Sequence, residues 1–189
     1  MSGSPFRLLP AVLCLLTTAC VQLDYKNFPE SWPVVHVSGS GCPRLTGVFD
    51  ETDLTEKYPV WLHQWLLQVP DGLEAQVQRI EFIGPDAGTL ALRLMDADGS
   101  ELLKHELREG VDYECRGGWL ERSKSSSPFA GLVTSKAARL TLNDREDLVV
   151  ESTETLAGVA IVLPTYQSRN DWHVYRRHGM KSCHLHRCG

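Results

Sequence analysis

Hydrophobic and polar residues alternate with a period of two over most of the chain after residue 76. This alternation is typical of β-strands that bury one face and expose the other. The hydrophobic positions of the predicted strands are Ile80 and Phe82; Leu90, Leu92 and Leu94; Leu103 and Leu107; Val111, Tyr113 and Cys115; Leu140 and Leu142; Leu148 and Val150; Val159, Ile161 and Leu163; and Trp172 and Val174. Gly-, Asp- and Asn-rich turns separate most of them, so we expect consecutive strands to form hairpins.

One further strand is predicted over residues 44–50. The sequence therefore predicts about eight to nine short strands in a mostly β fold, arranged as a single antiparallel β-barrel or sandwich over residues 42–177. We expect the Ser-rich residues 123–128 to form a loop. His105 is expected to face the core as a hydrogen-bonded residue.

A change to helical spacing marks residues 56–68. Trp61, Leu62, Trp65 and Leu66 fall on one face of a helix there, and Pro70 ends the pattern. The sequence therefore predicts one amphipathic helix near residues 56–68. Its apolar face either covers the sheet or contacts a ligand or partner through Trp61 and Trp65.

The composition narrows the classes of protein that remain. The chain has 189 residues, with 19 Lys and Arg, 24 Asp and Glu, and a formal net charge of −5. This length suits one domain. An acidic chain lacks the basic surface that nucleic-acid binding needs, so no nucleic-acid partner is expected. The positive charge gathers near the end, in a basic tail predicted over residues 178–189.

The N-terminus has the three parts of a secretion signal. Arg7 precedes an apolar run from Leu8 to Ala19, which is shorter than the roughly 20 residues that span a bilayer. Leu16-Thr17-Thr18-Ala19-Cys20 resembles the lipobox of bacterial lipoproteins. The resemblance implies that residues 1–19 are a signal peptide and that Cys20 carries the lipid anchor. Because Val21 is not Asp, it also implies the outer membrane, facing the periplasm. Residues 20–41, rich in Pro, Gly and Ser, are expected to form a flexible tether.

Four cysteines remain after Cys14 and Cys20: Cys42, Cys115, Cys183 and Cys188. In an oxidising compartment they are disulfide candidates, and four cysteines allow three pairings. The simplest joins Cys42 to Cys115 and Cys183 to Cys188. The alternative for Cys42 and Cys115 is a pair of buried free thiols.

The C-terminal tail also contains metal-ligand residue types. Cys183, His184, His186 and Cys188 could hold zinc or copper, because thiolate and imidazole suit those ions. A disulfide between the two cysteines would compete with such a site, because only thiolates bind metal. The other interpretation is a solvated tail with no cofactor.

The body shows a further resemblance. Gly47-Val48-Phe49, the meander that follows and the end from Trp172 to Arg177 are similar to lipocalin-type barrels. The resemblance implies a barrel in which an arginine near the last strand packs on the Gly-x-Trp motif of the first strand. Phe49 stands where those barrels carry Trp.

The sequence contains no known catalytic or nucleotide-binding motif. Three functions remain as hypotheses for a lipid-anchored cell-envelope protein. A non-catalytic binding or structural module, for an apolar ligand or an envelope protein, predicts an apolar cavity or an exposed tryptophan patch. The alternatives are metal binding through the tail, and an enzyme acting on envelope material, which predicts a polar cleft with perturbed titration.

Overall fold

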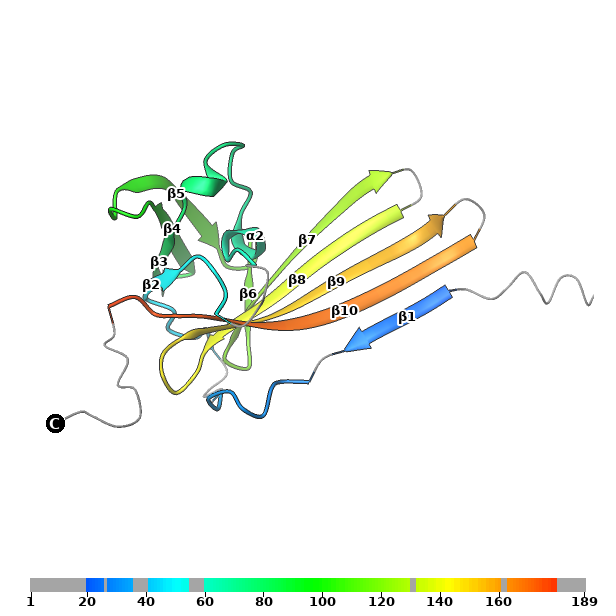
Figure 1. Ribbon diagram of the computed structural model, residues 1–189, viewed down its shortest axis with the longest axis horizontal. Helices are drawn as coiled ribbons and strands as arrows, with labels where there is room; N and C mark the ends of the chain where they lie inside the picture. The colour runs from blue at the N-terminus through cyan, green and yellow to red at the C-terminus, as the bar shows by residue number, and fades with distance from the viewer. Residues whose placement is uncertain are drawn as a thin grey trace, which may run out of the picture.

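The fold is that of a computed structural model, which describes residues 20–25, 27–35, 41–54, 60–129, 132–160 and 163–179. The described residues are mostly β-strand, which confirms the predicted fold class. The strands form two sheets, one of four strands and one of six, in the manner of a sandwich (Figure 1).

The smaller sheet is an antiparallel meander. It has the order β2-β3-β4-β5 and comprises β2 (Gly47–Asp50), β3 (Arg79–Asp86), β4 (Thr89–Met95) and β5 (Glu101–Arg108). Its alternating hydrophobic residues face inward as predicted, and β4 alternates buried and half-buried positions along its whole length. Ala87 and Gly88 form the two-residue turn between β3 and β4, and both have positive φ. That conformation suits the twist of a tight hairpin.

The larger sheet has the order β1-β10-β9-β8-β7-β6. Its strands are β1 (Cys20–Tyr25), β6 (Glu114–Arg116), β7 (Trp119–Phe129), β8 (Leu132–Leu142), β9 (Leu148–Ala160) and β10 (Leu163–Tyr175). All its pairs are antiparallel except β1, which runs parallel to β10.

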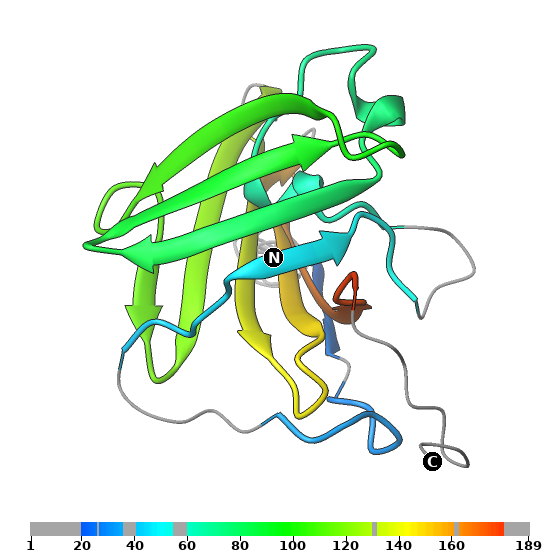
Figure 2. The same cartoon turned by 90° about the vertical axis from the view of Figure 1, so that its left-hand side faces the viewer.

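The hydrophobic core lies between the two sheets at one end of the larger sheet. Figure 2 shows the strands of the smaller sheet crossing those of the larger at a steep angle. Beyond this contact, β7 to β10 and β1 extend well past the smaller sheet (Figure 1). The fully buried side chains of the core include Phe49, Ile80, Phe82, Leu90, Leu92, Leu94 and Leu107 from the smaller sheet and Leu120, Leu140, Leu148, Val150 and Tyr175 from the larger.

Two short helices cover the side of the core. The α-helix α2 spans His63–Leu66, and the 3-10 helix η2 spans Glu74–Gln76. The predicted helix is thus present but shorter, and residues 55–59 lie outside the described part of the chain. Leu62 and Leu66 are fully buried, so this apolar face covers the core rather than a free surface.

Two contacts join distant parts of the chain. Cys42 and Cys115 form a disulfide with a Cα–Cα distance of 4.8 Å, which confirms the predicted pair. Arg177, just after β10, lies against Gly47 of β2, and its Nη2 donates to the carbonyl of Thr46 at 2.7 Å. A Cβ at position 47 would lie 2.8 Å from the Arg177 Nε, so only glycine leaves room for this guanidinium. The lipocalin resemblance implied an arginine against the first strand; that resemblance itself stays a prediction.

Four local expectations differ from the structure. Val111, predicted on the hydrophobic face of a strand, is 75% exposed in the turn between β5 and β6. Residues 20–25, expected in a tether, form β1 instead, and Phe28 and Trp32 pack in an aromatic group with Trp172. The Ser-rich stretch 123–128 continues β7, because its backbone pairs with β8 whatever its side chains. His105 is exposed rather than inward, because β5 is the edge strand and only Leu107 is fully buried in its second half.

Candidate functional site

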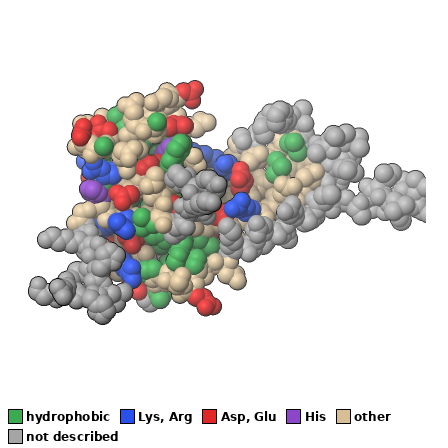
Figure 3. All heavy atoms as spheres, viewed as in Figure 1, with side chains coloured by type: hydrophobic (Ala, Val, Ile, Leu, Met, Phe, Trp, Pro, Cys, Tyr) green, Lys and Arg blue, Asp and Glu red, His purple; other side chains and the backbone are tan. Residues whose placement is uncertain are grey.

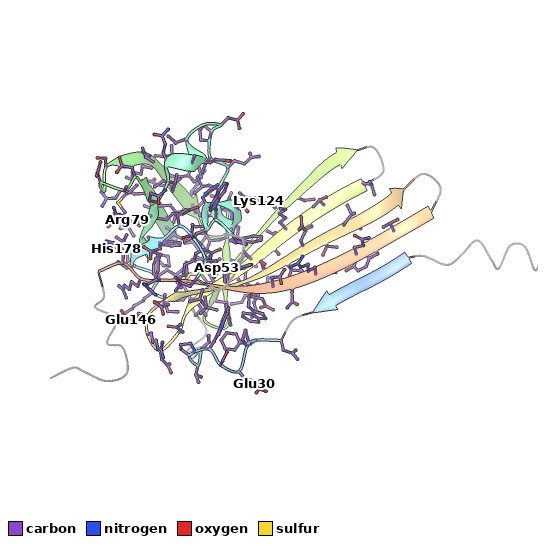
Figure 4. The ribbon with its side chains drawn as sticks, in the orientation of Figure 1. Glu30, Asp53, Arg79, Lys124, Glu146 and His178 are labelled. Atoms are coloured by element: carbon purple, nitrogen blue, oxygen red, sulfur yellow. A yellow bond between two sulfur atoms is a disulfide. The ribbon has the colours of Figure 1, made fainter. Side chains whose placement is uncertain are left out.

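A polar cleft of about 1040 Å³ opens between the α2–η2 segment and the β7–β8 hairpin. Lys124, which lines this cleft, lies beside α2 (Figure 4). The lining residues are His63, Gln64, Leu67, Gln68, Val69, Pro70, Asp71, Glu74, Lys124, Ser125, Thr134 and Lys136. Polar and charged side chains therefore dominate its walls.

Lys124 lines the cleft, and Arg122 lines a small adjoining pocket to which Lys124 also belongs. Arg122 precedes Lys124 on the same face of β7, and its Nε and Nη1 are buried without a hydrogen-bond partner among the described residues. Burial lowers the pKa of Arg122, and the charge of Asp112 acts against this shift. Burial and repulsion from Arg122 together lower the pKa of Lys124 to about 8. Lys136, opposite Lys124, is instead paired with Glu154 at 3.2 Å.

A buried carboxylate–histidine pair forms the wall beneath α2. Glu51 Oε1 contacts His63 Nδ1 and also accepts from the His63 backbone N–H at 3.1 Å. Both side chains are nearly fully buried. Burial raises the pKa of Glu51 above its usual 4.5, although the contacts with His63 oppose the shift. Trp61 stacks on the imidazole of His63, with 5.7 Å between ring centroids.

A second carboxylate–histidine pair lies behind the first. Asp53 Oδ2 lies 2.8 Å from His173 Nδ1, and Ser152 Oγ lies 3.2 Å from His173 Nε2. Trp65 stacks on His173 at 5.6 Å and donates from Nε1 to the Tyr175 hydroxyl at 3.2 Å. The sequence of contacts matches a Ser–His–Asp triad in its atoms.

The setting of this triad favours a structural role. Ser152 is buried and lies on β9, which pairs with β8 and β10 on its two sides. Its neighbouring backbone N–H groups therefore serve the sheet and are not free to stabilise an oxyanion. Asp53 Oδ1 also accepts from the Val174 backbone N–H at 3.3 Å. The network thus fastens the chain after β2 to β9 and β10.

An aromatic pocket of about 470 Å³ lies on the opposite face of the larger sheet. Its lining includes Phe28, Trp32, Trp119 and Trp172. The rings of Phe28 and Trp172 meet edge to face, with centroids 5.1 Å apart. Among its residues, only Phe28 and Trp32 could have indicated this pocket in the sequence, because they are aromatic residues within a segment predicted to be a tether.

The structure separates the residues that the sequence singled out. Trp61 and Trp65 are half-buried, and each stacks on one of the two paired histidines. Cys20 is the first residue of β1. Cys183, His184, His186 and Cys188 lie outside the described residues. Sulfur atoms of Cys42 and Cys115 lie near a Glu109 carboxylate, but the disulfide occupies both sulfurs.

Sequence reasoning missed Arg122 and Lys124 as functional residues. Both lie in or beside the Ser-rich stretch that the sequence predicts to be a loop. Their side chains share one face only because this stretch is a strand. The Glu51 and Asp53 carboxylates are separated in the sequence from their histidine partners, His63 and His173, so no local motif indicates either pair.

Comparison with known proteins identifies no relative. No family model, no curated protein and no solved structure matches the chain. Within the described residues, no helix is both long and apolar enough to cross a bilayer.

Proposed function

We propose that this chain is a lipid-anchored cell-envelope protein that binds an anionic ligand in the cleft between α2–η2 and the β7–β8 hairpin. The observation that carries the proposal is the Arg122–Lys124 pair, two partly buried cations with no ion-pair partner among the described residues. A carboxylate or phosphate oxygen that reaches from the cleft into the adjoining pocket lined by both residues would supply the missing acceptor and relieve the repulsion between them.

Binding is favoured over catalysis by the rest of the cleft. Among the described lining residues, no hydroxyl group is hydrogen-bonded to a histidine or lysine that could take its proton. The one lining histidine, His63, is held by Glu51 and covered by Trp61. A nucleophile paired with a base is the arrangement that acyl or phosphoryl transfer needs.

Titration with inorganic pyrophosphate tests the anion site. We expect calorimetry to show binding that weakens about fivefold or more in Lys124→Met, because one charge-assisted contact is lost. Affinity should also fall as the pH rises through about 8, where the free Lys124 ammonium loses its proton. Lys104→Met is the matched control, because Lys104 is half-exposed on the smaller sheet. Equal binding by both variants would contradict the proposal.

The same pKa shift predicts a pH-dependent stability difference. The pKa of Lys124 is lower in the folded chain than its usual 10.5, so folding costs free energy when Lys124 is protonated in both states. This cost is complete below pH 8 and disappears as the pH rises toward 10.5. We expect Lys124→Met to raise the free energy of unfolding by about 1 kcal/mol at pH 7, because partial exposure screens the charge. Urea unfolding at pH 7 and pH 10 should show the difference shrinking at the higher pH.

Intact mass of the protein from the membrane fraction tests the anchor. We expect a chain that begins at Cys20 and carries acyl groups, and a Cys20→Ser variant that carries none. An unlipidated mass for the unmodified chain would remove the anchor from the proposal and leave the anion site to be judged by its own titration.

A further inference from the structure

The two walls of the cleft between α2–η2 and the β7–β8 hairpin carry opposite charges. The acids that line it are Asp71, in the turn after α2, and Glu74, the first residue of η2. The bases that line it, Lys124 and Lys136, are register partners on β7 and β8, so their side chains share one face of the sheet. In Figure 3 acidic side chains lie along the top of the body, and Lys and Arg side chains lie below them, beside the projecting part of the larger sheet. We call Asp71 and Glu74 the acidic wall, and Lys124 and Lys136 the basic wall.

Each wall has charge that its own neighbours do not neutralise. Asp71 and Glu74 are exposed, and neither forms an ion pair with a described residue. On the basic wall Lys136 is paired with Glu154 at 3.2 Å, whereas Lys124 forms no ion pair with a described residue. A ligand that neutralises both walls therefore needs a positive group as well as a negative one.

The rest of the lining suits an uncharged segment between two such groups. Apart from His63, the remaining lining side chains carry no charge, and Leu67, Val69 and Pro70 are apolar. A short hydrocarbon chain in the cleft would contact these residues, because burial of apolar surface is favourable. The cleft, at about 1040 Å³, also has the size of a site for an organic ligand rather than for a small inorganic ion.

Charge repulsion separates a purely anionic ligand from a zwitterion in this cleft. The carboxylates of the acidic wall repel every negative group that enters. An ammonium at the acidic wall instead forms charge-assisted hydrogen bonds with these carboxylates, and such bonds are stronger than neutral ones. Complementary charges on both sides also fix the direction in which the ligand lies.

We propose that the cleft binds a zwitterion whose ammonium lies at the acidic wall, whose anionic group lies at Lys124, and whose apolar chain joins the two. The anionic group is a carboxylate or a phosphorus oxyanion, since the Lys124 ammonium donates to either. This inference deepens the proposed function by naming the class of ligand, and it rests on the anion site proposed there.

Calorimetric titration of the full chain with ω-amino acids, from γ-aminobutyrate to ω-aminooctanoate, tests both ends of the ligand. We expect the best-fitting member to bind at least about fivefold more tightly than the fatty acid of its length, which lacks the ammonium. It should exceed the alkylamine of its length by the same factor, because that compound lacks the anion. The aminoalkylphosphonate of that length then shows which anionic group the site prefers.

Asp71→Asn combined with Glu74→Gln should abolish the preference for the amino acid over the fatty acid. Binding of the amino acid should weaken at least about fivefold, because its ammonium loses both carboxylates. Pyrophosphate should bind more tightly, because its negative charge no longer meets the acidic wall. Both side chains are exposed, so the fold is expected to persist.

Asp86→Asn combined with Asp98→Asn is the matched control. It removes the same net charge from the smaller sheet, where Asp86 ends β3 and Asp98 lies in the turn before β5, and both side chains are exposed. Equal losses in the two double variants would overturn the inference, as would equal affinity of the wild-type chain for the amino acids and their fatty acids. Pyrophosphate binding without a preference for zwitterions overturns this inference and leaves the anion site standing. If pyrophosphate and every zwitterion fail to bind, both proposals are wrong.

Discussion

Removal of the disulfide between Cys42 and Cys115 should lower the free energy of unfolding by about 4 kcal/mol. The bridge closes a loop with a sequence separation of 73 residues. Chain-entropy estimates assign about 4 kcal/mol to a loop of this length, because the cross-link restricts the unfolded chain. It also fastens the segment before β2 to β6, a three-residue strand at the edge of the larger sheet. Urea unfolding of the double variant Cys42→Ser with Cys115→Ser measures the loss.

The reduced wild-type chain provides the comparison for this variant. Reduction should bring the wild-type midpoint to that of the double variant, and the reductant should change the double variant little. A loss below about 1 kcal/mol would show that the bridge adds little constraint to an already compact unfolded state.

Asp53→Ala should cost about 3–5 kcal/mol of stability. The change removes the acceptor of the His173 ring and of the Val174 backbone N–H, and both donors then remain buried. It also releases the connection after β2 from β10. Chemical unfolding with a spectroscopic probe of Trp65, which stacks on His173, measures the loss and reports its location.

Asp53→Asn separates charge from hydrogen bonding in this network. The amide keeps an acceptor and the side-chain volume, so we expect a smaller loss than in Asp53→Ala. Lys104→Ala is the exposed control. It breaks a solvated ion pair with Glu106 at 3.3 Å and should change stability by less than about 0.5 kcal/mol. An equally small effect of Asp53→Ala would show that water replaces the lost carboxylate.

Most of the sheet order follows from alternation and turn chemistry. The alternating hydrophobic residues and the Gly-rich turns of the sequence predict the strands and turns of the β3–β4–β5 meander. One buried face imposes the period of two on each strand. The sequence does not predict the distal half of β7. Its serines show no alternation of hydrophobic and polar residues, although its backbone pairs with β8. The strand β1 could not be predicted for a different reason. Its partner β10 is over a hundred residues away, and nothing local specifies a parallel edge strand.

The site was less predictable because its members meet only through the sheet register. His63 and His173 are paired with Glu51 and Asp53, but no spacing in the sequence joins His173 to Asp53. The Arg122–Lys124 pair could not be identified from the sequence, because it is the partial burial of both side chains in the fold that lowers their pKa values. The disulfide was predictable as one of three pairings, since oxidised cysteines must find partners in the same chain.

The parallel pairing of β1 with β10 determines how the protein responds to mechanical load. A pull on Cys20 directed away from the body runs along the strand axis. All six register pairs, from Cys20 opposite Thr165 to Tyr25 opposite Asn170, then share the load in shear. A strand entering from the other direction would instead peel from its neighbour one pair at a time. The edge strand β1 is thus oriented to resist a pull applied at Cys20.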